Sequence, residues 1–148
     1  MGGFGMVVGE GLCYPPLDLM YVAASLRRAE HEVTLIDAEA DGTSPEQVLA
    51  RVEELRPEVV GLATSSATIE LDLALGDRIK RARPDTLVFV TGSQGSKIPD
   101  MAMGVSAIDA VVRGEPELTV AEMVAELVAG RDPLAVDGLS VRRGDEVV

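Results

Sequence analysis

Loops rich in glycine, serine and threonine follow four of the apolar segments that the sequence predicts as β-strands. The carboxyl ends of parallel strands meet at one edge of a sheet, and ligands of open α/β sheets bind just outside that edge. Small residues let a large flat ligand approach the backbone, and hydroxyl and free N–H groups bind its polar arms or a phosphate. The candidate binding residues are Gly9, Glu10, Gly11, Leu12, Cys13, Tyr14, Thr64, Ser65, Ser66, Thr91, Gly92, Ser93, Gln94, Arg113, Gly114 and Glu115. Turns of any parallel α/β protein favour small residues, so these loops alone leave open whether a ligand binds.

The strands that position these loops are predicted from short apolar runs separated by helical segments. The runs lie near residues 4–8, 33–36, 58–63, 86–90 and 108–112. This alternation predicts a parallel sheet with helices on both faces, and five such units favour the flavodoxin-like strand order 2-1-3-4-5. We therefore expect one doubly wound (flavodoxin-like or Rossmann-like) α/β domain over residues 1–132. Residues 133–148 break the rhythm and predict a β-hairpin extension.

The first predicted strand is the least regular of the five. Gly5 interrupts the run from Phe4 to Val8, and two further glycines precede it. The sequence leaves open whether this strand is short or incomplete.

Two helices carry clear sequence signals. Ser44 and Gln47 form a capping-box pattern, with Pro45 at the first helical position. A second helix is expected from about Ile69 to Ala82, with a buried stripe made of Leu71, Ala74, Leu75 and Ile79. The basic residues near its end are expected to be structural, because cations favour the C-terminal end of a helix dipole. They are Arg78, Lys80, Arg81 and Arg83.

Composition excludes several classes of partner. The formal net charge of −12 argues against binding to nucleic acid or to an anionic membrane surface. Aromatic residues make up 3% of the chain, too few to enclose a flavin or a base between rings. A single cysteine excludes an internal disulfide and fits a reducing cytoplasm. No signal peptide is expected, and no apolar run reaches the roughly 20 residues of a membrane span.

Four segments in register resemble a known family. They are the Tyr-Pro-Pro-Leu loop at residues 14–17 with the His-Glu-Val run that ends at Asp37, and the later runs 57–62, 86–92 and 109–115. Together they are similar to the cobalamin-binding domain found in front of many radical S-adenosylmethionine enzymes. The resemblance implies that the four loops bind cobalamin, with its nucleotide tail along the sheet edge. Gly92 stands where many members carry Gly-Gly and is expected to lie against the ligand.

The resemblance also implies how the chemistry is divided. The Asp-x-His-x-x-Gly motif that supplies a histidine ligand to cobalt elsewhere is absent, and His31 is expected at the opposite, amino end of the sheet. Cys13 is interpreted as a small hydrophobic residue, and one cysteine cannot hold the Cys-x-x-x-Cys-x-x-Cys iron–sulfur cluster. The cluster, S-adenosylmethionine and catalysis, whether methyl transfer or related radical chemistry, would therefore belong to a catalytic domain outside this chain, in cis or in trans.

Other readings fit the residues less well. A phosphorylatable receiver domain needs an aspartate and a lysine where this chain has Ala63–Ser65 and Arg113. The Gly9-Glu10-Gly11 loop supplies neither the hydroxyls of a flavodoxin phosphate loop nor a complete dinucleotide fingerprint. The remaining alternative is a degenerate α/β interaction module that binds no cofactor.

Overall fold

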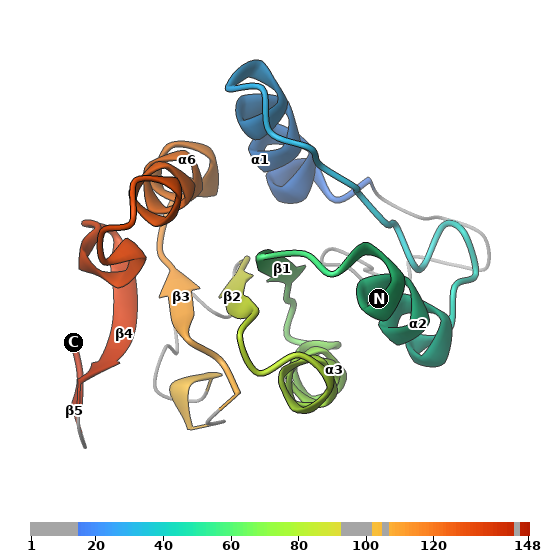
Figure 1. Ribbon diagram of the computed structural model, residues 1–148. Coiled ribbons are helices and arrows are strands. Elements are labelled where there is room, and N and C mark those ends of the chain that lie inside the picture. Colours follow the sequence, from blue (N-terminus) through green and yellow to red (C-terminus); the bar gives the residue numbers. More distant parts are fainter. Residues whose placement is uncertain (1–14, 93–101, 105–106, 144–145) are drawn as a thin grey trace.

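The computed structural model describes residues 15–92, 102–104, 107–143 and 146–148 (Figure 1). Its helices lie in two layers, one on each side of a central sheet. Helix α1 packs against α6 on one face, and α2 packs against α3 on the other (Figure 1). The elements are α1 (Leu17–Arg28), α2 (Pro45–Leu55), β1 (Val59–Ala63), α3 (Ile69–Ala82), β2 (Leu87–Thr91), β3 (Ala110–Val112), α6 (Pro116–Val128), the 3₁₀ helix η1 (Pro133–Ala135), β4 (Leu139–Arg143) and β5 (Glu146–Val147).

The described sheet has the order β1-β2-β3-β4-β5. Strands β1, β2 and β3 are parallel, with Val59 opposite Leu87 and Phe89 opposite Ala110. The predicted hairpin is present as β4 and β5, and β4 pairs antiparallel with β3. The predicted α/β fold with helices on both faces is confirmed, and the hairpin extends the sheet as an antiparallel edge.

Residues 33–36 differ from the prediction, because they belong to no strand of the described sheet. In the predicted order their neighbour is the segment 4–8, which lies outside the described residues. A strand needs a neighbour for its N–H and C=O groups. One such group, the Val33 carbonyl, accepts a hydrogen bond from the Arg27 guanidinium at 2.9 Å instead.

The local signals of the second helix appear as predicted. The Gln47 N–H donates to Ser44 Oγ (3.3 Å), and the Ser44 N–H donates to Gln47 Oε1 (2.8 Å). The helix ends at Leu55, and Arg56 adopts a left-handed conformation with φ of 49° before Pro57.

Helix α3 has the predicted bounds, but its buried side was predicted incorrectly. Leu71 is 57% exposed and Ala74 is also exposed. The helix approaches the sheet through Gly76, where an added Cβ would lie 2.8 Å from the Ile108 side chain. The buried residues are Ile69, Asp72, Leu73, Leu75, Gly76 and Ile79, so Leu75 and Ile79 alone match the expected stripe. The helix therefore turns a carboxylate inward.

Strand β2 is buried along its whole length and separates two apolar clusters. Leu87 and Phe89 pack on the side of α1 and α6, and Val88 and Val90 pack on the side of α2 and α3. An apolar run without alternation is typical of a parallel strand covered on both faces. No described helix is both long and apolar enough to cross a lipid bilayer.

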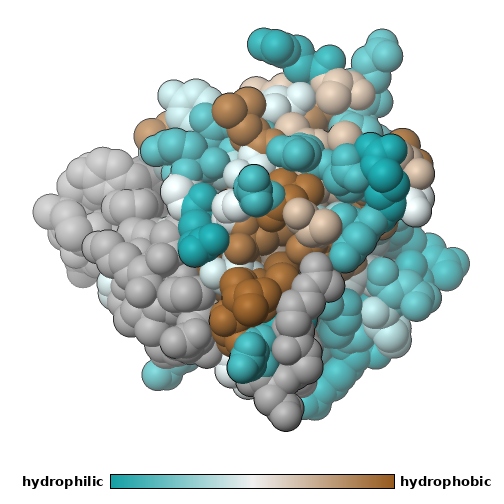
Figure 2. All heavy atoms as spheres, turned by 90° about the vertical axis from the view of Figure 1, so that its left-hand side faces the viewer, coloured by the Kyte–Doolittle hydropathy of each residue, from teal (hydrophilic) through white to brown (hydrophobic). Residues whose placement is uncertain are grey.

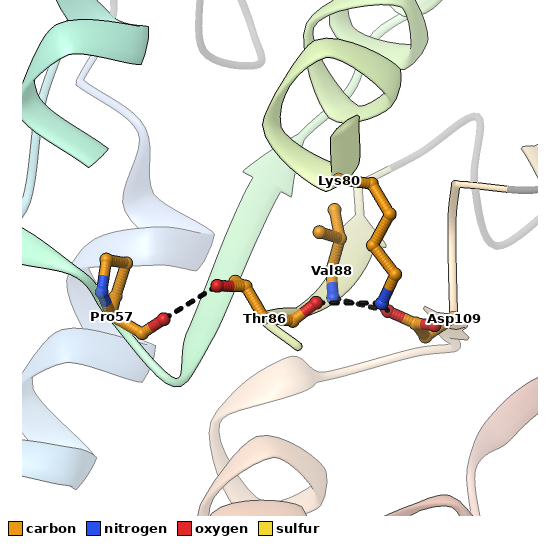
Figure 3. A network of polar contacts seen from close by, with 5 residues as sticks. All are labelled: Pro57, Lys80, Thr86, Val88 and Asp109. Atoms are coloured by element: carbon orange, nitrogen blue, oxygen red, sulfur yellow. Dashed lines mark hydrogen bonds and ion pairs between the residues drawn. The ribbon is translucent and has the colours of Figure 1, made fainter. Parts of the chain in front are cut away.

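A polar network fastens the amino ends of the three parallel strands (Figure 3). Asp109 Oδ2 accepts hydrogen bonds from Lys80 Nζ and from the Val88 N–H, each at 2.7 Å. Lys80 Nζ also donates to the Thr86 carbonyl (2.8 Å), and Thr86 Oγ1 donates to the Pro57 carbonyl (2.9 Å). Of the predicted basic cluster, Lys80 thus has the structural role expected.

We predict that Asp109→Ala lowers the free energy of unfolding by about 2 kcal/mol or more, because it removes the acceptor of two hydrogen bonds from a half-buried site. Urea unfolding followed by circular dichroism measures this. The matched control is Asp77→Ala, which removes the more exposed Asp77–Arg81 ion pair. Its expected cost is about 0.5 kcal/mol or less. Equal losses in the two variants would contradict the structural role of the network.

Candidate functional site

Three of the four predicted loops begin side by side at the carboxyl edge of the sheet. Thr64, Gly92 and Arg113 directly follow β1, β2 and β3, and Ala63 lies opposite Thr91 in the ladder. The fourth loop, Gly9–Tyr14, lies outside the described residues, and so do Ser93 and Gln94. The predicted residues that are described therefore gather at one edge of the fold.

Thr64 and Thr91 tie the ends of β1 and β2 together. The Thr64 N–H and Oγ1 both donate to the Thr91 carbonyl, at 2.8 and 3.0 Å. Both threonines are fully buried, yet Thr91 Oγ1 has no hydrogen-bond partner. A buried hydroxyl without a hydrogen-bond partner is costly. A ligand that reached Thr91 Oγ1 could supply the missing hydrogen bond.

Gly92 has a structural reason to be glycine. Its φ of 107° is one that L-residues rarely adopt, and an added Cβ would collide with the Thr64 carbonyl oxygen. The backbone of the neighbouring loop therefore requires glycine at this position, whether or not a ligand binds there. Contact between the Gly92 backbone and a ligand stays a prediction.

We predict that Gly92→Ala destabilises the domain more than Gly114→Ala, by at least about 1 kcal/mol. Both glycines have positive φ, but an added Cβ at Gly114 meets no atom within 4 Å. The difference between the two variants isolates the collision with Thr64 from the cost of the left-handed backbone. Urea unfolding of both proteins measures this difference. Equal losses of unfolding free energy would show that the close approach to Thr64 adds no cost.

The remaining predicted residues have less freedom to bind. Ser65 Oγ lies 3.0 Å from Thr68 Oγ1 within the turn before α3, whereas Ser66 is exposed. The Arg113 guanidinium donates to the Leu139 carbonyl (3.3 Å), and its N–H donates to the Gly138 carbonyl (2.9 Å). Arg113 thus fastens β3 to β4. Gly114 and Glu115 are exposed, and Glu115 precedes α6 without capping it through its side chain.

Sequence reasoning missed Asp72, the most unusual ionisable residue among those described. It lies in the first turn of α3, is 4% exposed, and its Oδ2 has no hydrogen-bond partner. Burial raises the pKa of the Asp72 carboxyl from 3.8 to about 6, although a bond with the Thr68 hydroxyl opposes the shift. The spacing of Ile69, Asp72 and Gly76 could have revealed it, because these residues share one face of the helix.

Glu117 is a second acidic residue with an unpartnered buried oxygen, in the helix that follows β3. It lies in the first turn of α6, and its buried Oε2 has no partner. Within the described part of the chain, the buried side-chain oxygens that lack a partner are therefore Asp72 Oδ2, Thr91 Oγ1 and Glu117 Oε2. All three belong to residues at the carboxyl end of a parallel strand or in the first turn of the helix that follows one. Buried polar atoms usually have hydrogen-bond partners, so three exceptions at the same edge of the sheet call for an explanation.

We predict that the stability of the wild-type domain falls by about 1 kcal/mol more than that of Asp72→Asn between pH 5 and pH 7. A carboxyl whose pKa is raised by folding stabilises the fold while it is protonated, and this contribution is lost as pH rises through about 6. Urea unfolding at the two pH values measures the difference. The control is the same acid-to-amide change at the exposed Asp85. If Asp72→Asn kept the pH dependence of the wild type, the loss of stability could not be assigned to the Asp72 carboxyl.

A groove of about 440 Å³ runs beside β1. Residues 31–36 and the whole of β1 line it, together with apolar side chains of α1, α2 and α6, and Asp72 also lines it. His31 follows the end of α1, where its N–H donates to the Leu26 carbonyl (3.1 Å), and it lines the groove as well. The described residues contain no group of three or more histidine, cysteine or acidic residues that could hold a metal ion.

Fold and site together define the class of protein. This is a doubly wound α/β domain whose described unpartnered buried oxygens lie at the carboxyl edge of its parallel strands. Residues 6–124 match the family model described as B12 binding domain. The chain belongs to this family and is a cobalamin-binding domain.

Longer proteins contain similar domains. The chain is 31% identical over 138 residues to an uncharacterized methyltransferase of Pyrococcus horikoshii, covering 93% of this chain and 30% of that protein. It is 30% identical over 141 residues to the anaerobic magnesium-protoporphyrin IX monomethyl ester cyclase of Synechocystis, covering 90% of this chain and 28% of that protein. The chain thus spans less than a third of these relatives.

A solved structure shares the fold. It is the radical S-adenosylmethionine methyltransferase TsrM from Kitasatospora setae, with cobalamin and a 4Fe–4S cluster bound. The TM-score is 0.81 at 20% identity, covering 92% of this chain and 28% of that chain.

The residues present fit cobalamin. Its corrin ring carries amide arms, whose NH₂ groups donate hydrogen bonds and whose carbonyls accept them. Asp72 Oδ2 and Glu117 Oε2 can accept from such NH₂ groups, and the Thr91 hydroxyl can donate to a carbonyl. Two carboxyl groups suit amide arms better than a phosphate, which they would repel when ionised.

Proposed function

We propose that this chain is the cobalamin-binding module of a radical S-adenosylmethionine enzyme whose catalytic domain lies outside it, in cis or in trans. The observation that supports this most directly is the set of unpartnered buried oxygens at the carboxyl edge of a B12-binding domain. When bound, cobalamin supplies a cobalt centre that can carry a methyl group. Methyl transfer or related radical chemistry would then take place in the partner domain. A cofactor-free interaction module would leave these polar atoms unexplained.

The chain's own residues would bind and orient the cofactor. Asp72 and Glu117 would hold amide arms from the first turns of α3 and α6, and Thr91 would bind between them. The Thr64–Thr91 link and Gly92 would keep the loops after β1 and β2 closely packed. The loop Gly9–Tyr14 with Ser93 and Gln94 would complete the binding surface. No histidine of the chain is assigned to cobalt.

Exposed apolar surfaces support a partner domain. Leu17, Met20 and Tyr21 share one side of α1 and are 55%, 43% and 61% exposed. Hydrophobic side chains also gather near the middle of the face that carries the C-terminal hairpin (Figure 2). Val148, at the end of that hairpin, is 57% exposed. Apolar surface of this kind is typical of interaction sites.

We predict that the purified domain binds added hydroxocobalamin, and that Asp72→Leu with Glu117→Leu weakens binding by about tenfold or more, because two hydrogen bonds are lost. Absorption spectroscopy and co-elution on gel filtration measure binding. The His31→Ala variant serves as control and should leave the spectrum of bound cobalamin unchanged. Absence of binding by folded wild-type protein at high cobalamin concentration would contradict the proposal, and an altered spectrum in His31→Ala would show that this histidine is misplaced.

A further inference from the structure

A chain of three polar side chains connects the loop after β1 with the interior of the fold. The Ser65 N–H donates to Thr68 Oγ1 (3.2 Å), and Ser65 Oγ lies 3.0 Å from the same atom. The Thr68 hydroxyl in turn forms a hydrogen bond with the Asp72 carboxyl. Thr68 is the N-cap residue of α3, yet its side chain does not cap the helix. Its hydroxyl instead links Ser65 to Asp72.

The inner end of this chain is an atom without a partner. Asp72 is 4% exposed, and its Oδ2 has no hydrogen-bond partner. The outer end, Ser65, lies two residues after β1, at the carboxyl edge of the sheet. The chain therefore carries the state of a buried carboxyl group to the loop where the described candidate residues gather.

Ionisation of Asp72 sets the direction of these hydrogen bonds. Thr68 Oγ1 accepts from the Ser65 N–H, so its one proton can be donated either to Asp72 or to Ser65 Oγ. An ionised carboxylate only accepts, so Thr68 then donates to Asp72, and Ser65 Oγ donates to Thr68. Asp72 Oδ2 and Ser65 Oγ both keep free lone pairs in this state, which suits a ligand that donates hydrogen bonds. A protonated Asp72 can donate to Thr68 and reverse the chain.

No described charged side chain contributes to the shift of the Asp72 pKa. Burial is its largest cause, and the Thr68 hydrogen bond opposes it. Helix α3 packs against α2 and β1, and β1 contains no ionisable residue. The charged or titratable groups around Asp72 are the pairs Glu46–Arg78, Arg51–Glu54, Asp77–Arg81 and Lys80–Asp109, the exposed Glu53 and Glu70, and the groove residues His31, Glu32, Arg56 and Glu58.

We propose that Asp72 selects an amide arm of cobalamin as a hydrogen-bond donor, and that binding of this arm releases the Asp72 proton to the solvent. This inference rests on the proposed function. The NH₂ group of an amide arm favours the ionised carboxylate to which it donates, whereas a carboxylate arm of a corrinoid would be repelled by it. Because the ligand prefers the ionised form, its affinity must rise with pH, and binding must displace the proton by the same coupling.

The pH dependence of hydroxocobalamin binding to the full chain tests this proposal. Between pH 5 and pH 7 the affinity of the wild type should rise about tenfold relative to that of Asp72→Asn, because Asp72 titrates at about 6 without ligand. Comparing the two proteins at each pH cancels titration of the cofactor and of other groups. The matched control is Glu70→Gln, an acid-to-amide change at an exposed residue of the same helical turn, which should follow the wild type.

Calorimetry measures the released proton directly. At pH 6, titrations in two buffers of different ionisation enthalpy should show that the wild type releases about half a proton more per bound cobalamin than Asp72→Asn. Equal proton release by the two proteins would overturn the linkage. An affinity that falls as pH rises, relative to Asp72→Asn, would also overturn it, because Asp72 would then bind the ligand as a protonated donor.

Thr68→Val keeps the test decisive if Asp72→Asn fails to fold. This variant removes the hydroxyl that stabilises the Asp72 carboxylate, so the midpoint of the affinity profile should move to higher pH. A midpoint that stays at the wild-type pH would contradict the hydrogen-bond chain.

Selection of an amide arm has its own measurement. The probes are cobalamin monocarboxylic acids, in each of which one amide arm is hydrolysed to a carboxylic acid. At pH 7 at least one of them should bind the wild type about tenfold more weakly than hydroxocobalamin does, and Asp72→Asn should lose most of this difference. Equal binding of all the probes, or discrimination that Asp72→Asn retains, would overturn the selection.

The outcomes also distinguish this inference from the proposed function. Cobalamin binding with the same pH profile in the wild type and in Asp72→Asn would refute the role of Asp72 and leave the proposed function standing. Absence of cobalamin binding by the folded wild type at every pH would refute both.

Discussion

The register of the three parallel strands is the constraint on which the rest of the structure depends. At the amino ends, the Asp109 carboxylate binds Lys80 and the Val88 backbone, and so fixes β2 against the start of β3 and the end of α3. At the carboxyl ends, the Thr91 carbonyl accepts two hydrogen bonds from Thr64. Because both ends are fixed, the loops that follow the strands begin side by side. A ligand site then needs only suitable side chains in those loops.

The sequence predicted well what depends on local chemistry. Ser44 and Gln47 form their capping box because both partners lie within four residues, and α3 has the predicted bounds. Sequence-based prediction failed where contacts between distant segments decide which residues are buried. Periodicity assigned Leu71 to the core, but the close approach of α3 at Gly76 turned Asp72 inward and Leu71 outward. A prediction that treats every acidic residue as exposed will miss acidic residues that the fold buries, such as Asp72.

Two further differences have the same origin in long-range geometry. Gly92 was expected to lie against a ligand, and the structure shows a separate reason for glycine there, because a Cβ would collide with the Thr64 carbonyl oxygen, 28 residues earlier in the chain. Residues 33–36 have the composition of a buried strand, but β structure requires a partner, and their predicted partner is the glycine-interrupted segment 4–8. The composition of a segment indicates whether it can form a strand, whereas the presence of a pairing partner decides whether the strand forms.

The unpartnered oxygens at the carboxyl edge connect stability with function. Each buried polar atom without a partner raises the free energy of the ligand-free fold by about 1–3 kcal/mol. A ligand that supplies the missing donors removes this cost, and it stabilises the folded state further in proportion to the logarithm of its concentration. Filling the site with apolar residues would remove the cost at Asp72 and Glu117 without any ligand. That the chain instead carries carboxyl groups there favours a site shaped for a polar ligand over a degenerate domain, in which such atoms would have no use.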